Sequence, residues 1–246
     1  MTKSILITGA AKGIGKALAL EMATRGYNLA LTDILFDELE QNRQTINQLH
    51  PSVRVETRKL DISDYDRVYD VINELDDAMG GLDTVYANAG IFFDGWIGQG
   101  NFHKYKKTVE INLLGGMATI DAAVSLFKKR NRGHIAAPAS IAAVRSLRGS
   151  GAYCATKMGI TMFLETVRTE LVKTDIKVSV LFPGYIDTDL NKNIKSRPFL
   201  IPVEKGAKII ANLLEKQVKS STVPVFPWNI IKHVLKILPV RIMARM

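Results

Sequence analysis

The sequence Thr8-Gly9-Ala10-Ala11-Lys12-Gly13-Ile14-Gly15 joins a short apolar run, Ser4–Thr8, to a segment of helical periodicity, Ile14–Arg25. Glycine tolerates unusual backbone dihedrals and lets another backbone approach closely, so this spacing predicts a tight strand-to-helix turn. Such a turn aims free N–H groups and the positive end of a helix at an anion. We therefore predict a loop that binds the phosphates of a dinucleotide, formed by Gly9, Lys12, Gly13, Ile14 and Gly15.

The first 190 residues alternate between strand-like and helix-like segments. Short apolar runs predict buried strands at Ser4–Thr8, Asn28–Thr32, Val53–Thr57, Leu82–Ala87, His134–Ala137 and Lys177–Phe182. Segments of helical spacing lie between them at Ile14–Arg25, Asp37–Leu49, Asp64–Met79, Phe102–Arg130 and Ala152–Lys173. This alternation predicts a single α/β, doubly wound domain of the Rossmann type, with a parallel sheet of about seven strands and helices on both faces.

The composition is that of a globular protein: 246 residues and 27.2 kDa, 47% hydrophobic and 23% charged. It excludes disordered, collagen-like and disulfide-stapled chains, because the single Cys154 permits no internal disulfide. We expect that cysteine to be a small buried filler. The apolar run after Met1-Thr2-Lys3 is too short for a signal peptide or a spanning helix, so we expect a cytoplasmic protein.

The net charge of +9 (33 basic minus 24 acidic residues) is concentrated at one end of the sequence. Residues 1–190 carry 22 charges of each sign, whereas residues 191–246 carry 11 basic residues and two acids. An excess of basic residues indicates three possible kinds of partner: nucleic acid, an anionic membrane or an acidic ligand. The basic end has few aromatic residues and no recognition motif, so we expect no nucleic acid partner.

Asp33 ends the second predicted strand, 18 positions beyond Gly15. A carboxylate there accepts hydrogen bonds from the adenosine ribose hydroxyls and repels a 2′-phosphate, which favours NAD over NADP. Lys12 argues the other way, because a cation in the loop can pair with a 2′-phosphate, so NADP stays an alternative. Taken alone, Asp33 would also suit the N-cap of the following helix.

Tyr153 and Lys157 stand four residues apart, so on a helix their side chains share one face. A free phenol has a pKa near ~10, too high for a base at neutral pH. A cation about 4 Å away contributes about 4 kcal/mol at an effective dielectric of ~20, enough to lower that pKa substantially. Ser140, 13 residues before Tyr153, ends a predicted strand at the carboxyl edge, where open α/β sheets bind ligands.

The glycine pattern and the Ser-Tyr-Lys spacing together resemble the short-chain dehydrogenase/reductase family, whose fingerprint is Thr-Gly-x-x-x-Gly-x-Gly. The resemblance implies that Tyr153 is the general acid/base, and that Lys157 lowers its pKa and holds the nicotinamide ribose. It also implies that Ser140 polarises the substrate oxygen and that Asn112 holds a water in a proton relay. Taken alone, an Asn within a helix is a local kink or packing feature.

Further matches extend to about residue 190. Asp61 and Ile62 resemble the family's adenine-contacting pair, and Asn88, Ala89 and Gly90 resemble its turn after the fourth strand. The segment around Pro183, Gly184, Ile186 and Thr188 resembles the motif that covers the nicotinamide. The family's members are usually homodimers or homotetramers, so we expect one of these states.

Two positions depart from the family pattern. Ala87 replaces the first Asn of the turn after the fourth strand, which removes one side-chain hydrogen bond. Pro138 lies two residues before Ser140, and proline is disfavoured in a central strand. We therefore expect Pro138 to introduce a bulge that re-aims Ser140.

The sequence shows no competing site. The histidines are scattered without metal-ligand spacing, so no metal is expected, and no Gly-x-Ser-x-Gly elbow of a serine hydrolase occurs. We divide the domain into a dinucleotide-binding and catalytic core (1–190), a substrate flap with a helix and the last strand (191–226), and a basic amphipathic C-terminal segment (227–246).

The flap is polar and basic, yet apolar residues lie within it and after the fourth strand. They indicate a small hydrophobic alcohol or carbonyl substrate: Ile91, Phe92, Phe93, Trp96, Phe199, Leu200 and Ile201. Lys192, Lys195 and Arg197 are either candidates for an acidic group on that substrate or part of a solvated loop.

In the C-terminal segment Lys232 and Lys236, then Arg241 and Arg245, repeat a four-residue spacing beside apolar residues. It predicts either a helix that docks on a neighbouring subunit or a peripheral membrane contact. The leading function is an oxidoreductase that transfers a hydride between a nicotinamide cofactor and a hydrophobic alcohol or carbonyl. The alternatives are an NADPH-dependent reductase of acyl or lipid-like carbonyls at a membrane surface, and a dinucleotide-sensing protein without turnover.

Overall fold

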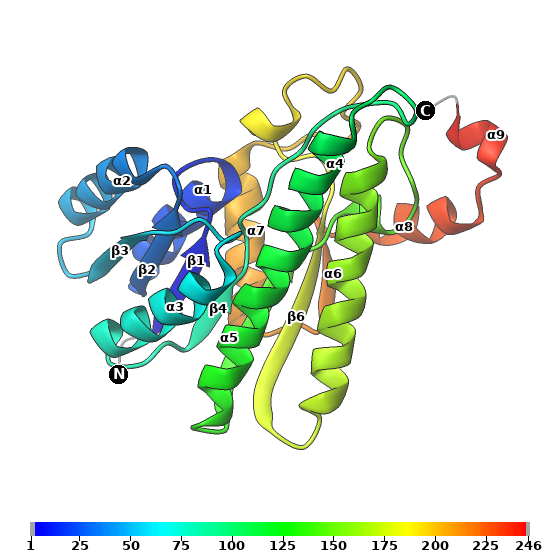
Figure 1. The fold of residues 1–246 in the computed structure, drawn as a ribbon. Coiled ribbons are helices and arrows are strands. Elements are labelled where there is room, and N and C mark those ends of the chain that lie inside the picture. The colour runs from blue at the N-terminus through cyan, green and yellow to red at the C-terminus, as the bar shows by residue number, and fades with distance from the viewer. Residues whose placement is uncertain (1–2, 245–246) are drawn as a thin grey trace.

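Seven parallel strands form one twisted sheet in the order β3-β2-β1-β4-β5-β6-β7 (Figure 1). The computed structural model describes residues 3–244, so Arg245 lies outside the described residues. The strands are β1 (Ser4–Thr8), β2 (Asn28–Asp33), β3 (Val55–Lys59), β4 (Thr84–Tyr86), β5 (Arg132–Pro138), β6 (Asp175–Pro183) and β7 (Ser220–Val223). Strands β1 to β6 fall at the six predicted runs, and β7 is the last strand expected within residues 191–226.

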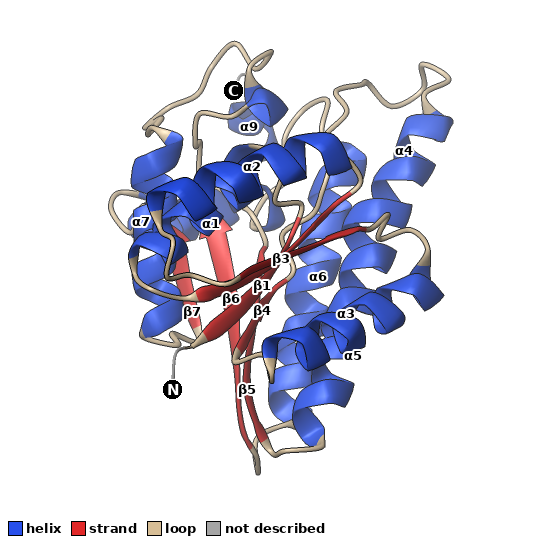
Figure 2. Cartoon of the chain, turned by 90° about the vertical axis from the view of Figure 1, so that its left-hand side faces the viewer, coloured by secondary structure: helices blue, strands red, loops and turns tan. Residues whose placement is uncertain are grey.

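Helices cover both faces of the sheet, as Figure 2 shows. One layer consists of α1 (Gly13–Thr24), α2 (Phe36–Leu49) and α7 (Val203–Glu215). The other consists of α3 (Tyr65–Met79), α4 (Phe102–Val109), α5 (Gly116–Lys128) and α6 (Gly151–Glu170). Two separate hydrophobic clusters fill the two interfaces, around Leu18, Leu39 and Ile210 on one face and Val71, Phe127 and Leu164 on the other. The predicted doubly wound Rossmann fold is therefore confirmed.

The sheet reverses its winding at β1, which pairs with β2 on one side and β4 on the other. The chain leaves the adjacent strands β1 and β4 toward opposite faces of the sheet. A crevice therefore opens beyond the carboxyl ends of these two strands. All seven strands are parallel, and the turns that follow them meet at this one edge of the sheet.

The helix expected over Phe102–Arg130 contains a π-helical segment, Glu110–Gly115, between α4 and α5. A π-helical turn inserts one extra residue and re-aims the side chains within it. At Gly115 a Cβ atom would lie 2.7 Å from the carbonyl oxygen of Ile62, so only glycine allows this close approach. By length and hydropathy the 27-residue stretch could cross a membrane, but half of its most apolar window is buried in the fold, where α5 packs against α3.

The bulge expected at Pro138 is absent, because β5 pairs with β6 in unbroken register from Arg132 to Pro138. In a parallel sheet alternate residues direct their N–H and C=O groups to opposite neighbours. The carbonyl of Ala136 accepts from Ala87 on the β4 side, so Pro138, two residues on, faces that same side. Strand β4 has ended at Tyr86, and the missing N–H of proline therefore costs no ladder hydrogen bond.

The C-terminal segment forms two short helices, α8 (Trp228–Ile237) and α9 (Val240–Met243). Its buried residues Trp228, Leu235 and Met243 pack against Ile141 and the partly buried Tyr185 of the same chain. The structure therefore places one face of the segment on its own domain, beside the end of β6. Residues 191–226 supply the flap, α7 and β7, and β7 completes the same sheet.

Candidate active site

The glycine loop leaves the start of α1 open to binding. Gly9 and Gly13 have positive φ angles of 68° and 55°, which side chains rarely adopt. The N-cap residue Lys12 makes no side-chain capping bond, and the first turn holds no acidic residue. Because the first N–H groups of a helix have no partner within it, this terminus suits the pyrophosphate of a dinucleotide.

A cavity of about 600 Å³ opens at the carboxyl ends of the strands. Seventeen of the nineteen residues predicted for the site line it: Gly9, Lys12, Gly13, Ile14, Asp33, Asp61, Ile62, Asn88, Ala89, Gly90, Ser140, Tyr153, Lys157, Pro183, Gly184, Ile186 and Thr188. They come from six strand ends and two helices, the start of α1 and α6. The two others, Gly15 and Asn112, lie outside the cavity wall.

Gly15 and Asn112 support the wall instead of forming it. A Cβ atom at Gly15 would lie 2.1 Å from the carbonyl oxygen of Gly9, so this glycine lets α1 pack on the loop. The buried Asn112 accepts a 2.7 Å hydrogen bond from the N–H of Ile91 and donates a 2.8 Å bond to its carbonyl oxygen. Its side chain therefore fixes the segment after β4, a packing role within the π-helical turn.

The turn after β4 is tied to the glycine loop across the switch point. Asn88 donates from Nδ2 to the carbonyl oxygen of Thr8 at 3.0 Å, and the N–H groups of Asn88 and Ala89 donate to the hydroxyl of Thr8 at 3.0 and 3.1 Å. These bonds hold the two loops together although Ala87 replaces an asparagine. They make Thr8 a positioning residue for the cavity floor.

Asp33 occupies the expected position at the end of β2. Its carboxylate accepts from the N–H of Ala11 at 2.8 Å and from that of Leu35 at 3.0 Å. The N-cap of α2 is Leu35, so Asp33 does not cap that helix. Lys12 lies 3.4 Å from the carboxylate of Glu38, and both side chains are exposed. Lys12 and Asp33 therefore line the same part of the cavity, and Glu38 pairs with Lys12 from outside its wall.

Ser140, Tyr153 and Lys157 converge at the other end of the cavity. Ser140 caps a 3₁₀ turn by accepting from the N–H of Ala142 at 3.1 Å, and its hydroxyl lines the same cavity as the phenol of Tyr153. Lys157 is buried, with Nζ 5.7 Å from the centroid of the Tyr153 ring. The same ammonium donates to the carbonyl oxygen of Pro138 at 2.9 Å.

The two titratable groups shift in the directions that burial imposes. Loss of hydration raises the pKa of Tyr153 to about 12, and the nearby hydroxyl of Ser140 opposes that rise. Burial lowers the pKa of Lys157 to about 8. The lowered Tyr153 pKa expected from Lys157 is therefore not observed, because desolvation of the phenolate is the larger effect. At neutral pH the phenol holds its proton and the lysine keeps its charge.

Two of the three predicted flap cations are paired within the chain, and the third, Lys195, is exposed. Lys192 pairs with Asp189, and Arg197 pairs with Asp187 at 2.7 Å. Ile201 is buried and bridges to Ile186, so it supports the flap. Of the predicted apolar residues, Ile91 lines the cavity, and Phe92 packs edge-on against Tyr153 with ring centroids 5.3 Å apart.

Several wall residues are not among those predicted from the sequence. Ile34 and Leu35 directly follow Asp33, so the end of β2 could have indicated them. Lys107 and Glu110 line the cavity from the helix around the π-helical turn, whose register no sequence signal reveals. Cys154 is buried, as expected for a filler. Among residues 3–244 no cluster of histidine, cysteine or carboxylate side chains is arranged to hold a metal ion.

Comparisons with known proteins agree with this geometry. The profile of the short chain dehydrogenase family matches residues 3–198. An uncharacterised oxidoreductase of Mycobacterium tuberculosis is 32% identical over 244 residues, covering 99% of this chain and 96% of that protein.

Two solved structures are similar throughout. An alcohol dehydrogenase from the archaeon Thermococcus sibiricus, complexed with 5-hydroxy-NADP, has a TM-score of 0.81 and 27% identity over 90% of this chain and 95% of that one. A short chain dehydrogenase from Mycobacterium paratuberculosis, bound to NAD, has a TM-score of 0.82 and 22% identity over 90% and 96%. With the glycine loop and the strand-end cavity, these findings show that the chain belongs to the short-chain dehydrogenase/reductase family and is a nicotinamide-dependent oxidoreductase.

Proposed function

We propose that this enzyme transfers a hydride between NAD and a small hydrophobic alcohol or its carbonyl, with Tyr153 exchanging the proton. One observation carries the proposal. Ser140, Tyr153 and Lys157 meet at one end of a cavity whose other end is formed by the glycine loop and Asp33. A dinucleotide along this cavity would present its nicotinamide to the three side chains.

Each of the three side chains has a distinct task in this reaction. The dinucleotide, when bound, supplies or accepts the hydride. Ser140 binds the substrate oxygen through its hydroxyl, which lines the cavity together with Tyr153. In carbonyl reduction the phenol of Tyr153 donates its proton to that oxygen, and in alcohol oxidation it removes the proton. Lys157 donates to Pro138 and has further N–H groups for the nicotinamide ribose.

The pKa values suit Tyr153 as the acid in the reducing direction. Its raised pKa keeps the phenol protonated at neutral pH, so a proton stands ready for the developing alkoxide. In the oxidising direction the phenolate must form, and the positive charges of Lys157 and of an oxidised nicotinamide favour it. Phe92 packs at right angles against the Tyr153 ring and supports its position.

The preference for NAD rests on charge at the adenosine end. Asp33 is fixed by two backbone N–H groups, so its carboxylate does not swing away from a 2′-phosphate. Lys12, the cation that could offset this repulsion, is paired with Glu38. Asp33→Asn keeps a hydrogen-bond acceptor and removes the charge. We therefore expect it to lower the ratio of the NADPH dissociation constant to the NADH dissociation constant about tenfold. Glu56→Gln, on β3 outside the cavity wall, is the control.

Exposed apolar side chains on the helical layer support a homodimer or homotetramer as the working form. Leu114, Met158 and Met162 are exposed on the π-helical segment and α6. Grouped apolar residues of this kind are typical of subunit interfaces. Sedimentation velocity across a concentration range measures the oligomer.

Tyr153→Phe tests the chemistry directly. We expect it to lower kcat by about 10²–10⁴-fold on an alcohol and carbonyl panel, while the dissociation constant for NADH stays within about twofold. Tyr65→Phe, on an exposed tyrosine of α3, is the matched control and retains full activity. Equal turnover by the Tyr153 variant would refute the assignment. NADH binding without turnover by the wild type on any member of the panel would favour the dinucleotide-sensing alternative.

A further inference from the structure

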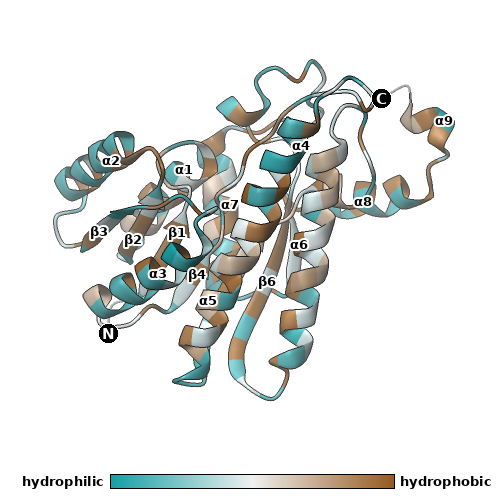
Figure 3. Cartoon of the chain, in the orientation of Figure 1, coloured by the Kyte–Doolittle hydropathy of each residue, from teal (hydrophilic) through white to brown (hydrophobic). Residues whose placement is uncertain are grey.

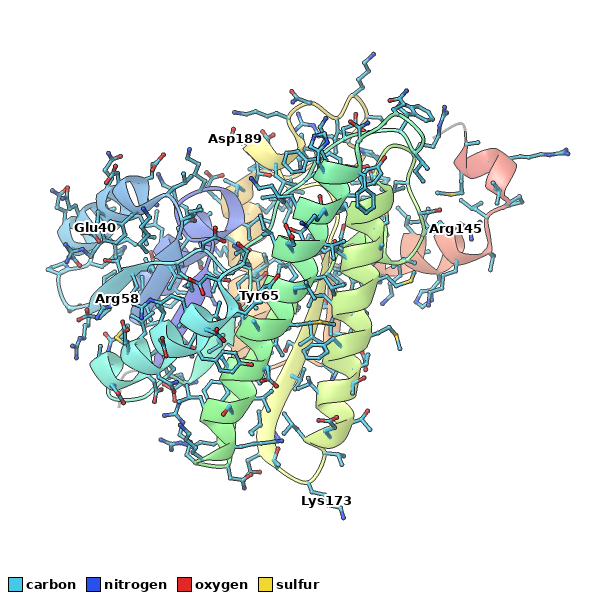
Figure 4. All side chains as sticks on the ribbon, viewed as in Figure 1. Glu40, Arg58, Tyr65, Arg145, Lys173 and Asp189 are labelled. Atoms are coloured by element: carbon cyan, nitrogen blue, oxygen red, sulfur yellow. The ribbon has the colours of Figure 1, made fainter. Side chains whose placement is uncertain are left out.

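The described part of the C-terminal segment, together with the preceding Phe226, spans residues 226–244. One of its two faces packs on the domain. Trp228, Leu235 and Met243 are buried on this inner face. Two arginines from the loop after β5 fasten its end, as Arg145 donates to the carbonyl oxygen of Leu238 at 2.9 Å and Arg148 donates to that of Ala244. Figure 4 shows Arg145 beside α8. The segment is therefore a built part of the fold with a defined outer face.

The outer face of the segment is apolar and exposed. Its side chains are Phe226, Ile230, Val234, Ile237, Val240 and Ile242. Ile230, Val234 and Ile237 stand at intervals of four and three residues within α8, which places them along one stripe of the helix, and Phe226 lies just before the helix. Ile237 is 81% exposed and Val240 is 73% exposed. Single exposed apolar residues need no explanation, but a continuous stripe marks an interaction surface.

Cations accompany this stripe, and the sequence supplies no acid to balance them. From Lys216 to Met246 the chain contains no Asp or Glu. Within the segment Lys236 and Arg241 are exposed, and Lys232 is partly buried with its ammonium 5.9 Å from the ring of Phe182. Hydrophobic and hydrophilic residues alternate along α8 and α9 in Figure 3. Apolar side chains flanked by lysine and arginine are the pattern of a helix that lies in a membrane interface.

We propose that the outer face of residues 226–244 docks on an anionic phospholipid surface, with α8 lying in the plane of the interface. The apolar stripe enters the boundary between headgroups and acyl chains, and Lys236 and Arg241 contact the phosphates. A second copy of the chain fits the same face poorly. A two-fold contact brings a patch against itself, so these cations would meet cations with no carboxylate in the segment to pair with them.

The docked face is joined to the substrate side of the cavity. Trp228, on the inner face of α8, packs so closely on Gly184 of the cavity wall that a Cβ atom there would lie 2.2 Å from the indole nitrogen. Arg148, which holds Ala244, also stacks 4.7 Å above the ring of the exposed Trp96. Docking would therefore bring the lipid surface to the segment that packs on the cavity wall at Gly184. The docking itself does not depend on the proposed reaction, and it is measured without turnover.

The test is co-sedimentation of the full-length protein with vesicles of phosphatidylcholine alone or with one quarter phosphatidylglycerol. We expect binding to the anionic vesicles, at least tenfold weaker binding to the neutral ones, and loss of binding at 0.5 M salt. Ile230→Glu with Ile237→Glu abolishes binding, and Lys236→Glu with Arg241→Glu weakens it at least tenfold. Val172→Glu, which alters a residue 76% exposed beyond α6, is the control and binds as the wild type does.

Unchanged NADH affinity verifies that each variant is folded. Wild-type protein that binds neither kind of vesicle overturns the proposal, as does equal binding by the stripe variant. If Ile230→Glu with Ile237→Glu instead lowers the oligomeric state in sedimentation velocity and no vesicle binding occurs in the wild type, the face is an interface between copies of the chain.

Discussion

Lys157 Nζ donates a 2.9 Å hydrogen bond to the carbonyl oxygen of Pro138, the last residue of β5. The proline lies where β4 has already ended, so its carbonyl has no strand partner on that side and is free to accept. A residue that breaks sheets elsewhere thus fixes the lysine of the site. The bond holds the ammonium beneath Tyr153 without a neighbouring carboxylate that would raise its pKa.

The lowered pKa of Lys157 predicts a pH-dependent affinity for NADH. Burial brings that pKa to about 8, so the ammonium is charged at pH 7 and neutral at pH 9.5. Loss of the charge weakens its hydrogen bonds to the ribose, and we expect the dissociation constant to rise about tenfold between these pH values. Lys157→Met binds more weakly at pH 7 and shows a flat profile. Titration of NADH fluorescence measures both, and a flat wild-type profile would contradict the role given to the lysine.

Replacement of Asn112 is expected to lower both the stability of the fold and the turnover rate. Asn112→Ala leaves the N–H and carbonyl of Ile91 without their side-chain partner in a partly buried site, which costs about 1–3 kcal/mol in the free energy of unfolding. Because Ile91 lines the cavity, kcat falls as well. Asn73→Ala, on an exposed position of α3, changes stability by less than about 0.5 kcal/mol. Urea unfolding compares the two, and equal midpoints would argue against the clamp.

Two glycines of the phosphate loop predict unequal costs on substitution by alanine. At Gly15 the new Cβ would meet the carbonyl oxygen of Gly9 at 2.1 Å and the amide of Asn88 at 2.7 Å, so backbone must move. We expect a loss of about 3 kcal/mol or more. At Gly13 the nearest atom is a Thr188 methyl at 3.5 Å, and the cost is the strain of a positive φ, about 1–2 kcal/mol. Thermal unfolding of both variants without ligand checks the order.

The sequence predicted the fold and most of the site because both depend on local pattern. Each of Gly9, Asp33 and Ser140 stands at or just after the end of a strand that its own neighbouring residues predict. Because the carboxyl ends of parallel strands meet at one edge of the sheet, the sequence alone is enough to bring these three residues to the cavity. What it missed depends on contacts between distant segments. The π-helical turn around Asn112 lies against Ile91 and Ile62, and the harmless position of Pro138 depends on where β4 ends.

The ion pairs and pKa values of the site also depend on contacts that form only in the folded chain. Lys192 and Arg197 are cations in a flap by sequence, but their pairing with Asp189 and Asp187 is a property of the folded loop. The pKa of Tyr153 likewise depends on how deeply the phenol is buried, which residue spacing does not reveal. Residue spacing indicates which groups share a face, and it leaves their hydration undetermined.

His134 of β5 predicts that acid destabilises the fold through one buried ring. Its Nε2 atom lies 2.7 Å from the hydroxyl of Ser179, and its Nδ1 atom is buried without a partner. Ser179 donates its own proton to Val218, so Nε2 carries the hydrogen and the ring is neutral. Burial lowers the pKa of His134 to about 4, because a second proton would place an unpaired charge in the core.

The sign of the effect follows from proton binding in the two states. Between about pH 6.5 and pH 4 the unfolded chain binds a proton at this histidine and the folded chain does not. The contribution to stability is therefore complete above pH 6.5 and is lost progressively as the pH falls toward 4. At pH 4.5 the loss reaches about 2–3 kcal/mol relative to pH 7.5. His134→Gln is less stable at pH 7.5 but lacks this part of the pH dependence, whereas His50→Gln, at a partly exposed position, keeps it. Urea midpoints at the two pH values measure the difference, and identical pH dependence in His134→Gln and the wild type would show that the ring does not titrate in this way.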